Sequence, residues 1–289
     1  MLRKDNLLKS KRSTRALTSH HNTLLKSKRS QITIFIILAI LIVVAIFLLF
    51  SLFQGQIKTY ITKQSMEPNQ KIEQCVNEIV KDASEKMIEN AGYIKPQKLS
   101  KQFGYRIGEA DEIPLKNYTY LCYTPEFRVR CIAKEGITIE HAKQEIYNYA
   151  KPKIENCFTN MKKELESSGY SVILGSNMSF SVELIPRAIR IEINRDLQFE
   201  KSGQSKKFTS YNVPTGSPLY DMLIVSQNIV EEEVMYCNSD YVSIMNQYKN
   251  FEINKFTTSD SVRIYTLKDL ISEEIFRFAV RGCVKPTPN

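Results

Sequence analysis

Six cysteines are the residues of this chain whose type and spacing say most about its chemistry. No two of them stand in a C-x-x-C pair, the spacing that thioredoxin-like redox sites and zinc ribbons require. Their number is even, which is typical of disulfide bonds formed in an oxidising compartment. We therefore predict that they are paired and structural. They are Cys75, Cys122, Cys131, Cys157, Cys237 and Cys283.

His141 is the only histidine after the first 30 residues, so any Ser/His/Asp triad or Cys/His pair would have to be built around it. It stands at the start of an expected helix between Glu140 and Lys143, where we expect its side chain to face solvent. The G-x-S-x-G sequence is absent from the chain, and one histidine disfavours zinc and copper sites. The sequence therefore predicts no catalytic residue, no metal and no cofactor.

Neighbouring carboxylates are the remaining candidates for acid or metal chemistry. Pairs such as Asp111–Glu112 and Glu273–Glu274 are too ordinary to indicate a glycosidase. The run Glu231–Glu233 is expected on the solvated face of a helix rather than at a metal.

The elements that position these residues follow an uncharged stretch, Ile32–Phe53, which lies between Arg29 and Lys58. A helix of about 22 residues is about 33 Å long, enough to cross a hydrocarbon core of about 30 Å. The first 30 residues contain nine basic residues and one acid, so most of the net charge of +9 precedes the stretch. Because excess Lys and Arg marks the inner side, we predict a single-pass protein of the cell membrane, with its N-terminus cytoplasmic and its C-terminal domain extracytoplasmic.

Two other interpretations of this stretch fit less well. A cleaved secretory signal has an apolar core of about 7 to 15 residues and an A-x-A-like site, whereas this core is longer and no such site follows it. A buried core helix would show an amphipathic pattern. The predicted organisation is a basic cytoplasmic tail at 1–30, a transmembrane helix at 31–53, a juxtamembrane helix or linker at 54–69 and an extracytoplasmic domain at 70–289.

The basic tail contains a duplication, because residues 7–13 recur at 24–30. Such a segment sets topology and contacts anionic lipid, at about 1 kcal/mol per basic residue near the surface. The exported part has a nearly balanced charge, so no nucleic acid is expected as a partner. The expected partners are the lipid bilayer, anionic lipid at the tail, and other surface proteins or glycans at the exported domain.

The residues Lys28, Arg29, Ser30 and Gln31, followed at once by the apolar stretch, resemble the class III signal of archaeal type IV pilin-like proteins. In that family a membrane peptidase cuts on the cytoplasmic side and the helix stays with the mature protein. The resemblance places the cut between Ser30 and Gln31. The family usually has Glu at the fifth mature position, where it aids filament assembly, and this chain has Phe35 there.

Hydrophobic periodicity divides the exported domain into helices and strands. Helices are expected at 70–90, 139–168 and 219–236, with a kink at Pro152 in the second. A polar loop should lead from the first helix to a hairpin of strands at 121–123 and 127–131. Further strands are expected at 170–174, 178–184, 188–194, 197–199, 206–211, 251–256, 262–267 and 274–281. The predicted class is α+β, with helices packed on a mostly antiparallel sheet.

The expected elements also predict how the cysteines pair. Two cysteines lie on the apolar stripes of the first two helices, so packing the stripes brings them together. Two others flank the turn of the hairpin, and the last pair follows by elimination. The predicted disulfides are Cys75–Cys157, Cys122–Cys131 and Cys237–Cys283. In the last strand we expect Phe276, Phe278 and Val280 on the buried face and Arg277 on the exposed one.

The order of elements resembles uncharacterised single-span surface proteins of small-genome archaea. The shared motifs are a K/R-x-Q-x-T-x-F helix start, a G-Y-I sequence at 92–94 and an F-x-F-A sequence at 276–279. The resemblance implies architecture and location. We expect a membrane-anchored cell-surface protein whose disulfide-stapled, non-enzymatic ectodomain serves adhesion, partner binding or pilin-like assembly; the alternative is an anchored extracytoplasmic hydrolase with an unrecognised site. Sequons at Asn117 and Asn177 permit glycosylation.

Overall fold

The computed structural model describes residues 35–48, 67–107 and 111–286. The chain divides into two compact units, Met1–Ser65 and Met66–Asn289. In the first unit, residues 35–48 form a helix whose apolar side chains are exposed. No helix within the described ranges is both long enough and apolar enough to cross a membrane.

Much of the N-terminal organisation expected from the sequence falls outside these ranges. The tail at 1–30, both ends of the expected transmembrane helix at 31–53, and all but the last three residues of the expected linker at 54–69 lie outside the described residues. The same holds for the candidate processing site at Ser30 and Gln31.

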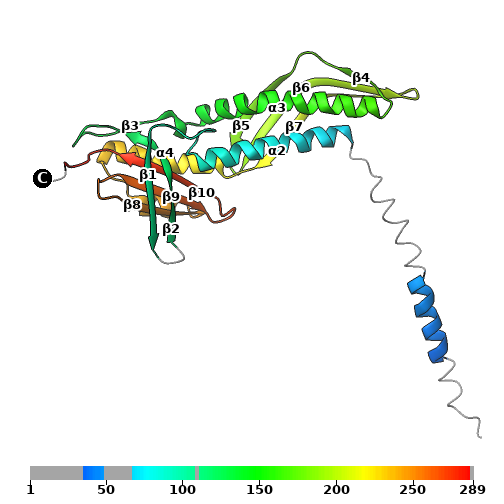
Figure 1. Ribbon diagram of the computed structural model, residues 1–289, viewed down its shortest axis with the longest axis horizontal. Helices are drawn as coiled ribbons and strands as arrows, with labels where there is room; N and C mark the ends of the chain where they lie inside the picture. The colour runs from blue at the N-terminus through cyan, green and yellow to red at the C-terminus, as the bar shows by residue number, and fades with distance from the viewer. Residues whose placement is uncertain (1–34, 49–66, 108–110, 287–289) are drawn as a thin grey trace, which may run out of the picture. The chain divides into compact units, whose positions relative to one another are not determined.

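Two long helices, α2 (Pro68–Glu89) and α3 (Ile139–Ser167), lie side by side along the second unit (Figure 1). α2 starts with proline, whose missing N–H has no partner to lose in the first turn. α3 starts after Thr138, whose hydroxyl accepts a hydrogen bond from the His141 backbone N–H at 3.3 Å. Both helices match the predicted ranges closely, and α3 continues through Pro152 as a single helix.

A four-stranded antiparallel sheet packs against α2 and α3 (Figure 1). Its central strand β6 carries buried Ile189, Ile191 and Ile193 at alternate positions, because one face of the strand faces the helices. β6 is continuous where two strands were expected, with a register shift between Asn194 and Leu197. The strands are β4 (Ser171–Leu174), β5 (Ser179–Ile185), β6 (Ala188–Lys201) and β7 (Gln204–Gly216).

A second, six-stranded sheet has the order β1-β2-β10-β9-β8, with β3 also paired to β2. All of its pairings are antiparallel except that of β2 with β10. Two helices, α4 (Leu219–Tyr236) and α5 (Tyr241–Gln247), accompany it, and a 3₁₀ turn, η1 (Glu135–Ile137), precedes α3. The strands are β1 (Ser100–Ile107), β2 (Asp111–Tyr123), β3 (Ile132–Ala133), β8 (Phe251–Thr257), β9 (Arg263–Asp269) and β10 (Ile275–Arg281). The predicted α+β class is confirmed, with two sheets.

Two expectations for this region are wrong. The supposed polar loop before residue 121 is the long hairpin of β1 and β2. The supposed strand at 127–131 is an irregular segment whose backbone pairs with the C-terminal segment, through Arg128 N–H to Val284 O at 2.9 Å and Cys283 N–H to Val129 O at 2.6 Å. The hairpin partner of β2 is therefore the short strand β3.

Both faces of β10 are covered, which corrects the expectation of one exposed face. Phe276, Phe278 and Val280 are buried in the main core as predicted. Ala279 is buried in a second, smaller core with tyrosines of β2, and Arg277 is half-buried. The β1–β2 hairpin folds across this outer face, since rings of β1 and of the far-edge strand β8 lie 4.9 Å apart between centroids.

Candidate functional site

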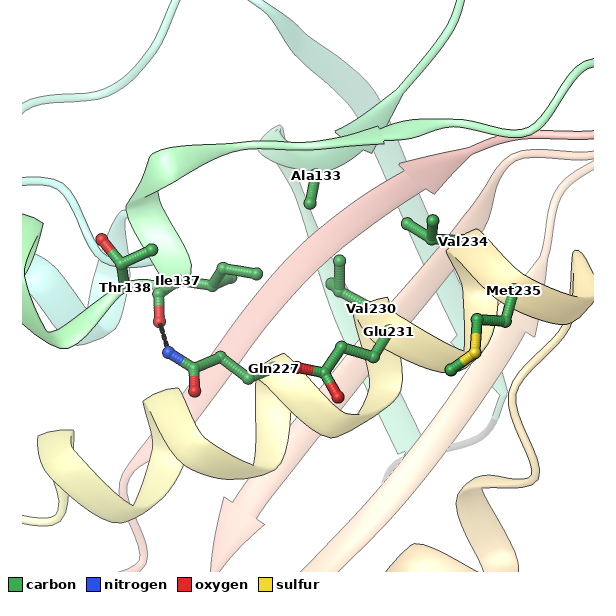
Figure 2. A pocket seen from close by; sticks show the side chains of 8 residues that line it. All are labelled: Ala133, Ile137, Thr138, Gln227, Val230, Glu231, Val234 and Met235. Carbon is green, nitrogen blue, oxygen red and sulfur yellow. Dashed lines mark hydrogen bonds between the residues drawn. The ribbon is translucent and has the colours of Figure 1, made fainter.

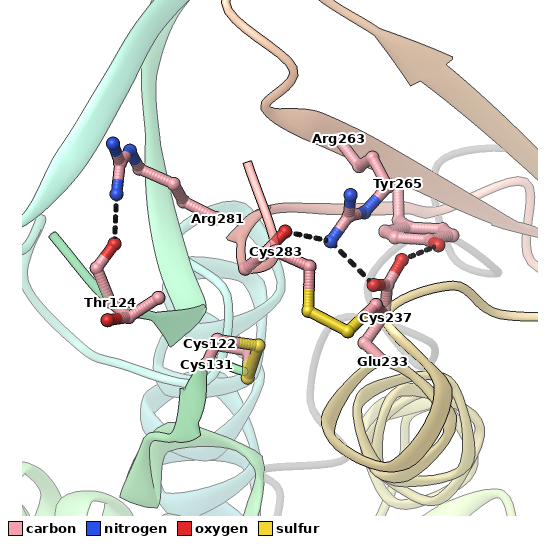
Figure 3. Close-up of a disulfide and its surroundings, with 10 residues drawn as sticks. Cys122, Thr124, Cys131, Glu233, Cys237, Arg263, Tyr265, Arg281 and Cys283 are labelled. Atoms are coloured by element: carbon pink, nitrogen blue, oxygen red, sulfur yellow. Dashed lines mark hydrogen bonds and ion pairs between the residues drawn. A yellow bond between two sulfur atoms is a disulfide. The ribbon is translucent and has the colours of Figure 1, made fainter. Parts of the chain in front are cut away.

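The three predicted disulfides are confirmed, and together they account for all six cysteines. One joins α2 to α3 and closes a segment of 82 residues, so it restricts the unfolded chain most strongly. The other two meet at the end of the second unit that contains β3 (Figure 3). Their Cα atoms are 6.2 Å apart in Cys75–Cys157, 5.3 Å in Cys122–Cys131 and 5.7 Å in Cys237–Cys283.

The segment closed by the second of these disulfides, residues 122–131, is here called the tip loop. Its ends are joined by Cys122–Cys131, and its backbone is hydrogen-bonded to the segment 281–284 at Thr124, Arg128 and Val129. That segment is itself tied to the end of α4 by Cys237–Cys283. Two disulfides and a short ladder of backbone hydrogen bonds therefore hold the tip loop in one shape.

The tip loop displays apolar and basic side chains in alternation. Phe127 is 52% exposed and Val129 is 40% exposed. Arg128 and Arg130 are exposed, and neither makes an ion pair or side-chain hydrogen bond within the described part of the chain. Arg128 has a φ of 59°, in the left-handed region that costs a non-glycine residue roughly 1 to 3 kcal/mol. Strain of this kind is concentrated at functional sites.

Phe127 is held from one side by a basic neighbour. The guanidinium of Arg281 lies 5.5 Å from the centre of the Phe127 ring and donates a hydrogen bond to the backbone oxygen of Thr124 (Figure 3). A cation placed over an aromatic ring in this way is attracted by the ring's electron-rich face. The aromatic side chain is thus oriented by the loop's own contacts before any partner arrives.

An apolar groove lies next to the tip loop, between α4 and the segment that runs from β3 into α3 (Figure 2). Its volume is about 480 Å³. The Gln227 side chain donates a hydrogen bond to the Ile137 backbone oxygen at 2.6 Å and so joins the two walls. The lining residues are Ala133, Ile137, Thr138, Gln227, Val230, Glu231, Val234 and Met235. Exposed apolar surface thus continues from the tip loop onto the end of α4.

The tip loop and groove lie at the opposite end of α2 from Pro68, the first residue of the helix (Figure 1). α2 has 22 residues and is therefore about 33 Å long. After α2, Gly92 has a φ of 89° and its Cα packs against the Gly136 carbonyl of η1, where a side chain would not fit. The Tyr93 hydroxyl accepts a hydrogen bond from the Gly136 N–H at 3.1 Å. These contacts fix the groove wall to the far end of α2.

A buried ionic cluster lies beneath this end of the unit and corrects the expectation that Glu231–Glu233 is a solvated face. Glu233 is fully buried and pairs with Arg263 of β9, 2.7 Å apart between Oε2 and Nη2 (Figure 3). Tyr265 donates its hydroxyl to the same carboxylate, and burial followed by this negative charge raises the pKa of Tyr265. Arg263 also donates to the Gly282 backbone oxygen at 3.0 Å. The cluster joins α4 to β9 and to the C-terminal segment that supports the tip loop.

A second polar cluster joins the two long helices. Asp82 of α2 accepts hydrogen bonds from Lys86, from the Tyr149 hydroxyl and, at 3.3 Å, from Lys153 of α3. The hydrogen bonds from Lys86 and then Tyr149 lower the pKa of Asp82 to about 2. Because Asp82 belongs to α2 and two of its partners belong to α3, this cluster, which lies near the protein surface, couples the two helices.

His141 is not the solvent-facing residue that the sequence predicts. Its ring lies 4.8 Å from the ring of Tyr93, edge to face, and its Nε2 atom is buried and has no hydrogen-bond partner among the described residues. Asn117 and Asn177 are exposed, as glycosylation requires. Within the described ranges, no group of three or more His, Cys, Asp or Glu residues is arranged to hold a metal.

Comparison with known proteins gives no match: no family model, no curated protein and no solved structure is similar to this chain. The tip loop was also missed by sequence reasoning, because Phe127–Cys131 alternates as a strand does. A signal was nevertheless present, since a Thr-Pro pair lies between two cysteines that we expected to pair. Such a short closed segment favours a displayed loop.

Proposed function

We propose that this chain is a membrane-anchored, non-enzymatic surface protein that binds a partner through the tip loop. The observation that carries the proposal is the display of Phe127, Val129 and two unpaired arginines on a loop fixed by two disulfides. Aromatic and arginine side chains are enriched where proteins bind one another. A loop that is already ordered loses little conformational entropy on binding.

The anchor and its topology are proposed from the sequence. The uncharged stretch Ile32–Phe53 is long enough to span a bilayer, and the basic tail before it favours a cytoplasmic N-terminus. Three disulfides in the second unit support an oxidising compartment for that unit. Within the second unit, the tip loop lies at the far end of α2 from Pro68.

Processing between Ser30 and Gln31 by a class III signal peptidase is included in the proposal, with the sequence as its support. The alternative function, an anchored hydrolase, would need a base near a nucleophile. The one histidine of the second unit instead packs against Tyr93 with its Nε2 buried. That placement favours the binding function.

The location is tested with the full chain carrying one epitope tag at its C-terminus and another at its N-terminus, expressed in cells that lack the class III signal peptidase so that the proposed cut before Gln31 does not remove the N-terminal tag. Antibody applied to intact cells should label the C-terminal tag, and the N-terminal tag should become accessible only after the membrane is permeabilised. Labelling of the N-terminal tag on intact cells would contradict the proposed topology. In cells that contain the peptidase, the N-terminal residue of the membrane-extracted protein, determined by mass spectrometry, then tests cleavage before Gln31.

The binding function is tested by replacing Phe127 with photoreactive benzoylphenylalanine in the full chain. Illumination of intact cells should produce a covalent adduct with another macromolecule. The control places the same group at Ile173 of β4, which is 63% exposed and lies at the other end of the second unit. Equal adduct formation from both positions, or none from position 127, would refute a binding role for the tip loop.

A further inference from the structure

A second exposed turn has the apolar character of the tip loop and the opposite charge. Residues 270–274, here called the acidic turn, connect β9 to β10. Leu270 is 52% exposed and Ile271 is 64% exposed. Glu273 and Glu274 follow them, and neither carboxylate makes an ion pair or side-chain hydrogen bond within the described residues. The turn therefore presents two apolar side chains beside two carboxylates, of which Glu273 is exposed and Glu274 is half-buried.

The acidic turn is also fixed in shape. Its base is Asp269, which is fully buried and accepts hydrogen bonds from Ile271 N–H at 3.2 Å and from the Ser272 hydroxyl at 2.7 Å. Arg187 pairs with the same carboxylate at 2.7 Å. Burial alone would raise the pKa of Asp269, but these partners lower it below its ordinary value. Asp269 and Arg187 pair with each other. Glu273 is exposed, and Glu274 is half-buried and is attracted to Arg187 at longer range, so the turn keeps a net negative charge.

Other charges near the tip loop and the acidic turn do not remove the difference in sign between their net charges. Around the acidic turn, Lys268 is placed directly opposite Glu252 across β8 and β9, and exposed Lys249 precedes Asn250, whose backbone oxygen binds Leu270 N–H. These lysines leave an excess of carboxylate. Around the tip loop, Arg281 and Lys285 add to Arg128 and Arg130, and Glu126 is the one acid within residues 122–131.

The two surfaces cannot meet within one molecule. β10 starts immediately after the acidic turn and ends at Arg281, whose backbone oxygen binds Thr124 of the tip loop. The strand has seven residues and is therefore about 23 Å long. The acidic turn and the tip loop lie at opposite ends of this rigid element, so a contact between them requires two molecules.

We propose that the tip loop of one copy binds the acidic turn of a second copy. The arginines would pair with Glu273 and Glu274, for which the guanidinium fork is well suited, and Phe127 and Val129 would cover the exposed leucine and isoleucine. This inference rests on the proposed binding role of the tip loop and names its partner. The contact joins two different surfaces, so in a pair one copy keeps its acidic turn free and the other keeps its tip loop free. The assembly therefore grows head to tail until it closes into a ring or extends.

The test uses the full chain in a neutral detergent, with its disulfides intact, and measures mass by light scattering over a range of concentrations. Two charge-reversal variants are compared with the wild type, Arg128→Glu/Arg130→Glu and Glu273→Arg/Glu274→Arg. Each alone should weaken self-association by about tenfold or more, because like charges then face each other. An equal mixture of the two should associate again, since every contact in a mixed pair joins opposite charges. Recovery on mixing also shows that both variants are folded.

The matched control for Glu273→Arg/Glu274→Arg is Glu192→Arg/Glu200→Arg, which makes the same change of net charge at exposed positions of β6. It should associate as the wild type does. A wild-type chain that stays monomeric, variants that associate normally, or a mixture that does not recover would each overturn the inference. If the wild type is monomeric while position 127 still crosslinks to another macromolecule in cells, the second copy is wrong and the binding function stands. If the wild type stays monomeric and binds anionic vesicles more tightly than Arg128→Glu/Arg130→Glu, which retains the same basic tail, the partner of the tip loop is lipid and the inference is overturned.

Discussion

Glu233 provides the sharpest test of the interior, because Glu231, an exposed residue of the same type on the same helix, serves as a control. In the change Glu233→Ala, Arg263 loses its buried counter-charge and Tyr265 loses the acceptor of its hydroxyl. Removing one partner of a buried ion pair typically costs about 3 to 5 kcal/mol. Arg263 keeps its hydrogen bond to the Gly282 backbone oxygen, so we expect a loss near the lower end of this range. Glu231→Ala, at an exposed position of the same helix, should cost under about 0.5 kcal/mol.

The measurement is guanidinium unfolding of the full chain in neutral detergent, followed by circular dichroism with the disulfides intact. Glu233→Ala should lower the midpoint without changing the slope, since the unfolded chain exposes the same surface. Glu233→Gln keeps the side-chain volume and an acceptor for Tyr265, so it should lie between the wild type and Glu233→Ala. The double change Glu233→Ala/Arg263→Ala should cost less than the sum of the two single changes, because it leaves no unpaired buried charge.

One result would refute the reasoning directly. If Glu233→Ala and Glu231→Ala unfold at the same denaturant concentration, Glu233 is not held in a buried pair. In that case the position of α4 on β9, and with it the support beneath the tip loop, would be wrong. Equal effects of the double change and the summed single changes would show that Glu233 and Arg263 are not coupled.

The remaining predictions concern other parts of the second unit. Cys75→Ser/Cys157→Ser should lower the unfolding free energy by about 2 to 5 kcal/mol, since the disulfide closes a long segment; peptide mapping without reductant that links either cysteine elsewhere would contradict the pairing. Phe278→Ala should cost about 3 to 5 kcal/mol of unfolding free energy, as truncation of a buried aromatic does. Arg277→Ala should cost less than this but more than a change at an exposed position, because Arg277 is half-buried and donates to a threonine hydroxyl on β9. Equal melting of the two variants would be inconsistent with these faces of β10. The pKa of Asp82 falls from an ordinary 3.8 to about 2 on folding, so its stabilisation is complete above pH 3.8 and is lost as the pH falls towards 2. Asp82→Asn should remove that part of the acid sensitivity, at a neutral-pH cost under about 1 kcal/mol because the carboxylate is partly exposed and solvent screens its ion pairs. An unchanged acid profile would show that Asp82 does not contribute.

The errors made from the sequence have a common physical cause. Three successive residues of an α-helix span about 200° of its circumference, so the members of Glu231–Glu233 point in different directions, and Glu233 is the one that faces the sheet. A signal was present, since Glu233 follows Val230 and Ile229 by three and four residues, on the buried stripe of α4. Hydrophobic patterning alone treats a charged residue as exposed, and Arg263 became visible as its partner only when β9 was packed beneath the helix.

The β1–β2 hairpin illustrates the same limit for strands. Tyr118 and Tyr120 alternate as a strand requires, but they cover a small outer core on a segment that is otherwise polar. The two tyrosines are buried only because they cover Val262 and Ile264, which lie more than 140 residues later in the chain. No local pattern contains that information.

The sequence by itself determined the elements with strong local periodicity. The stripes of α2 and α3 placed Cys75 and Cys157 on facing surfaces, and that pairing could be derived because helix geometry relates spacing directly to direction. The tertiary structure alone decided what covers each edge and end. The segment 281–284 occupies the place beside residues 124–129, which turns an alternating sequence into the displayed tip loop. Because this segment directly follows β10, the tip loop lies one strand length away from the acidic turn. No local sequence pattern predicts that contact between distant segments, which depends on the packing of the whole unit.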